Sequence, residues 1–177
     1  VSRPRRGWVA GPAADPELRA AVAAGGRVGC GTQARRLGLW MLEEPGLHLS
    51  LPRHSGHAQP PDGTTAHWRG REWRSGHATA DPLPTVLRDL ADCLPLETAL
   101  CALDSALNTG AMPFGDLERV LRDTRRGIRL LPLLDPAAES GLETLVRYRL
   151  ALAGIEARTQ VRVDGVGRVD LLVGERL

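Results

Sequence analysis

Three polar side chains near the C-terminal end of the sequence have the types and the order expected of a divalent-metal site. Glu143 stands at the start of a helical segment, Gln160 in a strand-like segment, and Asp170 in a second strand-like segment among apolar neighbours. An unpaired buried carboxylate would be costly, so Asp170 needs solvent or a partner such as a metal ion. Carboxylate and amide oxygens suit Mg²⁺, which polarises a phosphate and activates water in metal-dependent nucleases. We therefore predict Glu143, Gln160 and Asp170 as catalytic residues, with Glu143 and Asp170 as Mg²⁺ ligands.

Each of these residues also has a simpler structural explanation. Ser140 and Glu143 have the spacing of a capping box, in which the two side chains satisfy free amides at the start of a helix. Asp170 can pair with Arg162 or Arg168 across a hairpin, and the glutamine can be an exposed strand residue. Both interpretations stay open at the level of sequence.

The elements that must position these residues follow from a change of apolar period at Gly154. A helix is predicted over 140–153, followed by strands over 159–163 and 167–173 that an Asp-Gly turn joins. The helix stripe expected to be buried consists of Leu142, Leu145, Val146 and Leu150. A nuclease site needs a further acidic strand, which would follow Leu177. We therefore expect an incomplete sheet whose outer strand edge favours a homodimer.

The order S-x-x-E, helix, glycine, strand with glutamine, turn and G-R-V-D-L-L-V resembles the Vsr-like endonuclease-related domains of the PD-(D/E)XK superfamily over residues 137–177. In that family the glutamate of S-x-x-E and the aspartate of the V-D strand belong to the site, and they match Glu143 and Asp170. The family pattern continues with an E-x-D-G strand and a histidine-bearing segment, for which this sequence has no counterpart. The resemblance implies Mg²⁺-dependent phosphodiester hydrolysis in a complete protein and an inactive, incomplete site in this chain.

Upstream segments resemble the AbiEi-type antitoxin-related proteins of actinobacteria, which often place a Vsr-like domain after such a region. The matching segments are 25–34 with Leu39-Trp40, 47–53 and 81–91. This resemblance implies an alternative function, that of a non-enzymatic antitoxin or transcriptional regulator that binds DNA, a toxin or another protein partner. Full members often begin with a winged helix-turn-helix, and residues 3–8 match the end of such a wing.

Basic residues in the first part of the chain suit a DNA contact. Residues 1–80 contain eleven arginines and six acidic residues, a net charge of +5, whereas residues 81–177 contain twelve and fifteen, a net charge of −3. Arginine neutralises phosphates and stacks on bases, and tryptophan stacks as well. The predicted DNA-binding residues are Arg3, Arg5, Arg6, Arg69, Arg71 and Arg74. The competing interpretation is an exposed hairpin in which Trp68 or Trp73 covers the edge of the core.

Histidines and cysteines give little sequence support to a zinc site. The five histidines stand between 48 and 77, in and around a proline-rich loop with no cysteine at the interval of a zinc motif. The three cysteines are odd in number and lack C-x-x-C spacing, which argues against a disulfide framework and against a thiolate zinc site. Cys93 and Cys101 stand in apolar helical sequence and are predicted to be reduced and mostly buried.

The rest of the pattern predicts a mixed α+β fold. A helix is expected from Asp15-Pro16 to the Gly25-Gly26 stop, and a second from a Thr32 cap to Gly38. Strands over 47–51 and 65–69 are expected to pair into a small sheet. Helices are predicted over 84–94, 95–108 and 113–123, the first two separated by a proline. The expected units are a basic module over 1–80, a helical middle over 81–136 and an endonuclease-like element over 137–177.

Composition restricts the location and the chemistry of the protein. No segment approaches the roughly 18 apolar residues of a membrane span, and no signal-like leader is evident, so we expect a cytoplasmic protein without a membrane partner. All 23 basic residues are arginine. The lysine that many D…E-x-K nucleases use therefore cannot come from this chain.

Overall fold

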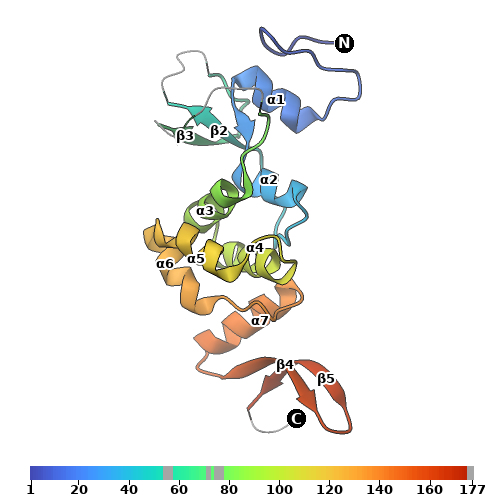
Figure 1. Ribbon diagram of the computed structural model, residues 1–177, viewed down its shortest axis with the longest axis vertical. Coiled ribbons are helices and arrows are strands. Elements are labelled where there is room, and N and C mark those ends of the chain that lie inside the picture. Colours follow the sequence, from blue (N-terminus) through green and yellow to red (C-terminus); the bar gives the residue numbers. More distant parts are fainter. Residues whose placement is uncertain (54–57, 71–72, 74–77, 175–177) are drawn as a thin grey trace.

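The computed structural model describes residues 1–53, 58–70, 73 and 78–174. The described chain is elongated, with the N-terminal arm at one end, the C-terminal hairpin at the other and the helices between them (Figure 1). Helices combine with two small sheets, which confirms the mixed α+β class. None of the described helices is long and apolar enough to cross a membrane.

The elements follow one another in the order helix, small sheet with one inserted helix, helical middle, and helix with hairpin. The helices are α1 (Pro16–Ala24), α2 (Cys30–Arg36), α3 (Leu83–Cys93), α4 (Leu96–Asn108), α5 (Phe114–Arg122), α6 (Arg125–Leu130), the 3-10 helix η1 (Leu131–Leu133) and α7 (Gly141–Leu152). The strands are β1 (Arg27–Val28), β2 (His48–Pro52), β3 (Thr65–Arg69), β4 (Ala157–Val163) and β5 (Gly167–Val173).

The first two helices differ in how well their caps were predicted. The carboxylate of Asp15 accepts hydrogen bonds from the amides of Glu17 and Leu18, and Gly25 ends α1 at φ 77°, as predicted. The predicted Thr32 cap of α2 is wrong, because this helix starts earlier, after Gly29. Thr32 is buried inside the helix, and its hydroxyl donates to the Gly46 carbonyl. Its side chain therefore binds the backbone of the segment that leads into β2 instead of capping the start of α2.

The small sheet has the strand order β1-β2-β3, with β1 antiparallel and β3 parallel to β2. The predicted pairing of the second and third strands is therefore present, in parallel orientation, with Ser50 opposite His67. Because side chains alternate along a strand, His48 and His67 are diagonal neighbours on one face of the sheet. Leu49 and Leu51 point the other way and form a small core with α1.

The larger core is built from α2 to α6. Leu87 and Leu90 of α3 and Leu100 and Leu103 of α4 are fully buried in it. Helix α2 packs on α3 and contributes Cys30 and Ala34 to the same core. The first eighty residues thus supply part of the helical core, and the predicted division near residue 80 stays a prediction.

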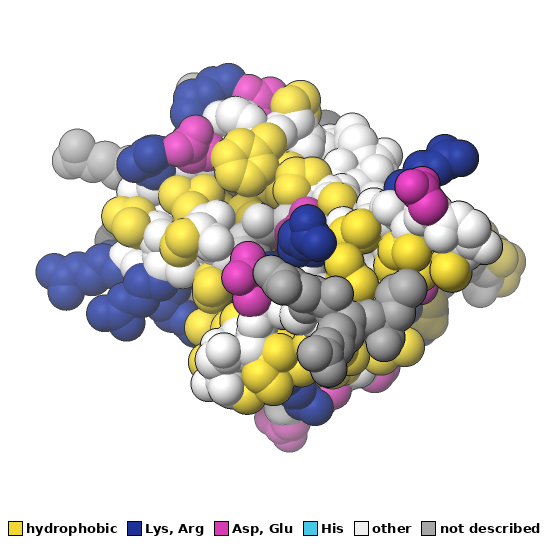
Figure 2. Space-filling model, turned by 90° about the horizontal axis from the view of Figure 1, so that it is seen from below, with side chains coloured by type: hydrophobic (Ala, Val, Ile, Leu, Met, Phe, Trp, Pro, Cys, Tyr) yellow, Lys and Arg dark blue, Asp and Glu magenta, His cyan; other side chains and the backbone are white. Residues whose placement is uncertain are grey.

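The last unit consists of α7 and the antiparallel β4–β5 hairpin, as the change of apolar period predicted. The predicted buried stripe of α7 is wrong, because Leu142 and Val146 are exposed. The helix instead buries Gly141 and Thr144. A Cβ at Gly141 would lie 2.0 Å from the Trp40 ring, so only glycine permits this approach. Figure 2 views this end of the molecule, where apolar side chains lie among separate charged ones.

Candidate functional site

The structure brings together the three residues predicted as a metal site. The side-chain amide nitrogen of Gln160 on β4 lies 3.0 Å from Oε2 of Glu143 on α7 and 3.4 Å from Oδ1 of Asp170 on β5. One amide group therefore reaches carboxylates from two other elements. Asp170 is exposed, whereas Glu143 and Gln160 are half-buried. The three side chains form an open polar site between the helix start and the hairpin.

Glu143 also closes the capping box that the sequence allowed. The Ser140 hydroxyl donates to Oε1 of Glu143 at 2.7 Å, and the Glu139 amide donates to Oε2 at 2.9 Å. The Ser140 hydroxyl in turn accepts a hydrogen bond from the Glu143 amide. Burial disfavours the charge on Glu143, but the hydrogen bonds from Glu139, Ser140 and Gln160 outweigh it and lower the pKa of its carboxyl. Glu143 is therefore an ionised carboxylate that both caps the start of α7 and accepts a hydrogen bond from Gln160.

Gln160 has an unusual backbone and an unsatisfied side-chain oxygen. Its φ is 51°, in the left-handed region that side chains other than glycine rarely adopt. Such strain occurs preferentially at functional sites. The two carboxylates are acceptors, so they orient the amide nitrogen toward themselves. Its oxygen, Oε1, is buried and accepts no hydrogen bond from the described part of the chain.

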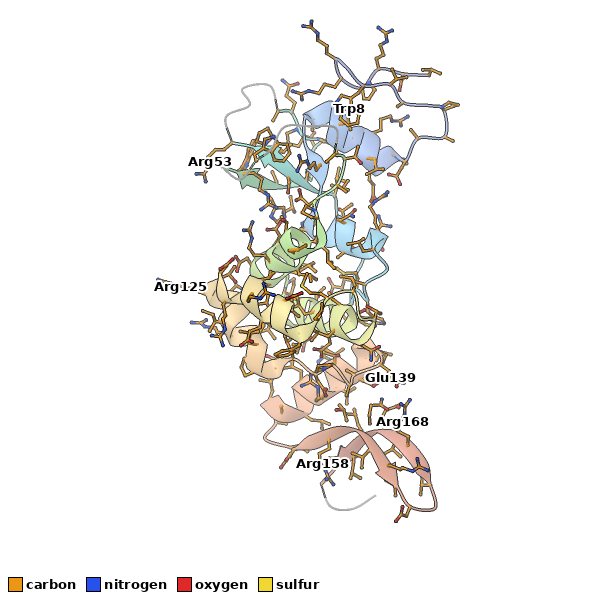
Figure 3. The ribbon with its side chains drawn as sticks, viewed as in Figure 1. Trp8, Arg53, Arg125, Glu139, Arg158 and Arg168 are labelled. Atoms are coloured by element: carbon orange, nitrogen blue, oxygen red, sulfur yellow. The ribbon has the colours of Figure 1, made fainter. Side chains whose placement is uncertain are left out.

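The cross-hairpin ion pair proposed as an alternative for Asp170 is not formed by Arg168. The guanidinium of Arg168 instead lies 2.7 Å from Oε1 of Glu139, one residue before the α7 cap. Figure 3 shows these two side chains facing each other between α7 and the hairpin. Arg168 thereby ties β5 to the start of α7 and leaves Asp170 beside Gln160.

The arginines predicted to bind DNA divide into three groups. Arg3, Arg5 and Arg6 in the N-terminal arm are exposed. Arg71 and Arg74 lie outside the described residues. Arg69 is only 8% exposed, and its guanidinium contacts Ser50, Asp81 and Asp89. The prediction is therefore wrong for Arg69, because two buried carboxylates hold its charge in the interior.

A basic and aromatic cleft lies beside α1. Arg5, Trp8, Arg27 and Trp73 line a cavity of about 280 Å³ there. The guanidinium carbon of Arg27 lies 4.5 Å from the centre of the Trp73 ring, a cation–π contact. Figure 3 labels Trp8 next to α1, at the end of the molecule opposite Glu139 and Arg168. Trp68, the other tryptophan considered as a core cover, is 47% exposed.

The structure also brings together two cysteines and two histidines whose spacing in the sequence matches no zinc motif. Cys30, His48, His67 and Cys93 each offer a ligand atom, and these atoms all lie within 4.8 Å of one another. Hydrogen bonding to Cys30, His48 and His67 lowers the pKa of the Cys93 thiol, while pairing with Cys93 and burial raise the pKa of Cys30. No short motif exists because each residue comes from a different element. Cys101 is buried, as predicted, and Cys93 is only partly so.

Comparison with known proteins gives no assignment. No family model matches the chain, and neither the curated proteins nor the solved structures contain a significant match.

Proposed function

We propose that this protein acts on DNA and that α7, β4 and β5 carry part of an endonuclease-like Mg²⁺ site. The observation that supports the proposal is the Gln160 amide group within reach of both Glu143 and Asp170. The amide hydrogens of Gln160 carry partial positive charge and lie between the two carboxylates, where a bound cation would also lie. The resemblance of residues 137–177 to Vsr-like domains assigns the same two carboxylates to the metal.

The proposed chemistry is phosphodiester hydrolysis by metal-activated water. Glu143 and Asp170 would each give Mg²⁺ one oxygen, and rotation of the Gln160 amide would present Oε1, a neutral oxygen ligand of the kind hard cations accept. The ion would polarise a phosphate oxygen and lower the pKa of a bound water. Two carboxylates fill only part of an octahedral shell, so we expect weak Mg²⁺ binding and no cleavage until further carboxylate ligands complete it.

Divalent-cation binding tests the proposed ligands directly. Mn²⁺ takes oxygen ligands similar to those of Mg²⁺, and its binding can be followed by water proton relaxation with competition by Mg²⁺. We expect weak binding to the wild-type protein and its loss in the Asp170→Asn variant. The matched control is Asp164→Asn, which makes the same change in the exposed β4–β5 turn, away from Glu143.

Two results would count against these residues as ligands. One is a wild-type protein that binds no Mn²⁺ at millimolar concentration, and the other is equal binding by the Asp170→Asn and Asp164→Asn variants. Circular dichroism of all three proteins shows whether a loss comes from unfolding. A protein extended by a further acidic strand should cleave supercoiled DNA with Mg²⁺, and Asp170→Asn should abolish that cleavage.

A DNA-binding regulator without hydrolytic activity, of the antitoxin type, is the second candidate. Two observations favour it: both oxygens of Glu143 are occupied by the helix cap, and Arg5 lines an arginine–tryptophan cleft. Under this proposal, replacing Arg3, Arg5 and Arg6 by alanine should weaken DNA binding and reduce its salt dependence. Asp170→Asn should leave binding unchanged. Fluorescence anisotropy with a labelled duplex measures both effects, and unchanged binding by the triple variant would exclude the arm as the contact.

A further inference from the structure

Four potential metal ligands converge where the small sheet meets the helical core. Cys30 is the first residue of α2, His48 the first of β2, and Cys93 the last of α3, while His67 lies in the middle of β3. Each of these elements packs against at least one of the others: α2 on both β2 and α3, and β2 on β3. The convergence is therefore a property of the fold and not of one flexible loop.

We infer that Cys30, His48, His67 and Cys93 bind one Zn²⁺ ion in a closed, tetrahedral, structural site. Two thiolates and two imidazoles are a ligand set that structural zinc sites use. The site is distinct from the residues of the proposed Mg²⁺ site, and the inference does not depend on that proposal.

The distances among the ligand atoms agree with a tetrahedron around zinc. Zinc bonds of about 2.3 Å to sulfur and about 2.0–2.1 Å to nitrogen place two nitrogens roughly 3.3 Å apart and a sulfur and a nitrogen roughly 3.6 Å apart. Nδ1 of His48 lies 3.3 Å from Nε2 of His67 and 3.9 Å from Sγ of Cys93. Small side-chain rotations would bring all four atoms to bonding distance.

The surroundings of the four side chains support this coordination. Cys30 adopts φ 42°, a left-handed backbone that a cysteine rarely takes, and its side chain is fully buried. On the other side, Nδ1 of His67 faces the Asp89 carboxylate at 3.9 Å, so Nε2 is the nitrogen presented to the cluster. Metal-ligating histidines usually direct their second nitrogen toward a carboxylate in this way. Arg69 holds Asp89 in place.

A structural role follows from the number of ligands and from where they lie. Four protein ligands leave no open position for water or substrate. The ion would connect β2 and β3 to α2 and α3, at the face of the sheet opposite the small core of Leu49 and Leu51. His67 and Cys93 also line an open cleft with Arg88 and Asp92, which gives the ion a path from solvent.

The metal content of the purified protein tests the inference. We expect one zinc ion per chain by elemental analysis after purification under reducing conditions, and loss of the ion in Cys30→Ser and Cys93→Ser variants. Cys101→Ser is the matched control, because Cys101 is also buried in a helix but does not belong to the cluster, and its thiol donates a hydrogen bond to the Gly141 carbonyl. This variant should retain the full zinc content.

A measurement on the unaltered chain keeps the inference testable even if the serine variants do not fold. Wild-type protein refolded with Co²⁺ should show the visible absorption of a tetrahedral site and the charge-transfer band of cobalt–thiolate bonds, and Zn²⁺ should displace the cobalt. A strong chelator should lower the melting temperature, and Zn²⁺ should restore it. The inference is overturned if the folded, reduced wild-type protein takes up neither ion, or if its Cys30 and Cys93 are joined by a disulfide.

Discussion

At the scale of single residues, the most unusual carboxyl group is that of Asp104 on α4. It is 1% exposed, and it accepts hydrogen bonds from the Asp135 amide, the Thr144 hydroxyl and the Arg147 guanidinium. Burial outweighs these contacts and raises the pKa of Asp104 from 3.8 to about 6. This carboxyl therefore joins α4 to the loop before α7 and to α7 itself.

The raised pKa of Asp104 predicts a specific pH dependence of stability. The folded protein binds this proton more tightly than the unfolded chain, so the contribution of Asp104 is largest below pH 3.8 and is lost as the pH rises from there to about 6. The expected change is about 3 kcal/mol in the free energy of unfolding. Urea denaturation at several pH values should show this component in the wild type and not in the Asp104→Asn variant. Parallel pH profiles of the two proteins would contradict the assignment.

Individual polar residues also show where sequence reasoning fails. Arg69 stands between aromatic and basic neighbours, as a DNA contact would, yet Asp81 and Asp89 neutralise it in the interior. The sequence contains all three residues, but their contact forms only when β3 and α3 pack together in the fold. The cluster of Cys30, His48, His67 and Cys93 has no short sequence motif for the same reason, because these residues meet through tertiary packing.

At the scale of elements, the sequence predicted the helices and strands whose ends and faces depend on residues close together in the chain. The prolines, the Asp15 cap and the 3.6-residue period identified α1, α3, α4 and α5, and the switch to alternation at Gly154 identified the β4–β5 hairpin. The direction of the β2–β3 pair could not be predicted, since two short apolar strands alternate equally well in either direction. The buried face of α7 depended on the contact of Gly141 with Trp40, which no helical period encodes.

The α7 cap allows the structural and metal-binding roles of Glu143 to be separated. Ser140→Ala removes the hydroxyl that caps the Glu143 amide and donates to Oε1. We expect a loss of about 1 kcal/mol in stability, with Mn²⁺ affinity unchanged or higher because Oε1 becomes free. Thr124→Ala, which removes the side-chain cap of α6, is the control for cap loss alone. If Ser140→Ala lowered the Mn²⁺ affinity and Thr124→Ala did not, the expectation would be wrong, and the cap would be needed to position Glu143 for the metal.

At the scale of the whole molecule, the two candidate metal sites lie in different parts of an elongated chain. The cysteine–histidine cluster joins the small sheet to the helical core, whereas Glu143, Gln160 and Asp170 lie where α7 meets the terminal hairpin (Figure 1). Loss of zinc should therefore first affect the stability of the region formed by α2, β2, β3 and α3. Substitutions at Asp170 should affect only the region of α7 and the β4–β5 hairpin. The two metals can be distinguished by their ligands, since thiolates select zinc and carboxylates select Mg²⁺.

The hairpin end also determines how copies of this chain are expected to associate. Within the described residues β5 pairs only with β4, so its other edge presents unpaired backbone donors and acceptors. Such an edge favours pairing with the same edge of a second copy. We expect concentration-dependent dimerisation of the wild-type chain in small-angle scattering or analytical ultracentrifugation.

Charge placed on that edge should prevent the association. Val173→Lys puts a charged side chain on the edge strand β5, where Val173 is 43% exposed, and such a charge opposes edge-to-edge pairing at little cost to the fold. Val166→Lys adds the same charge in the β4–β5 turn, at a position 65% exposed, and should dimerise like the wild type. A wild-type monomer at high concentration, or equal association of both variants, would show that the β5 edge is not the contact.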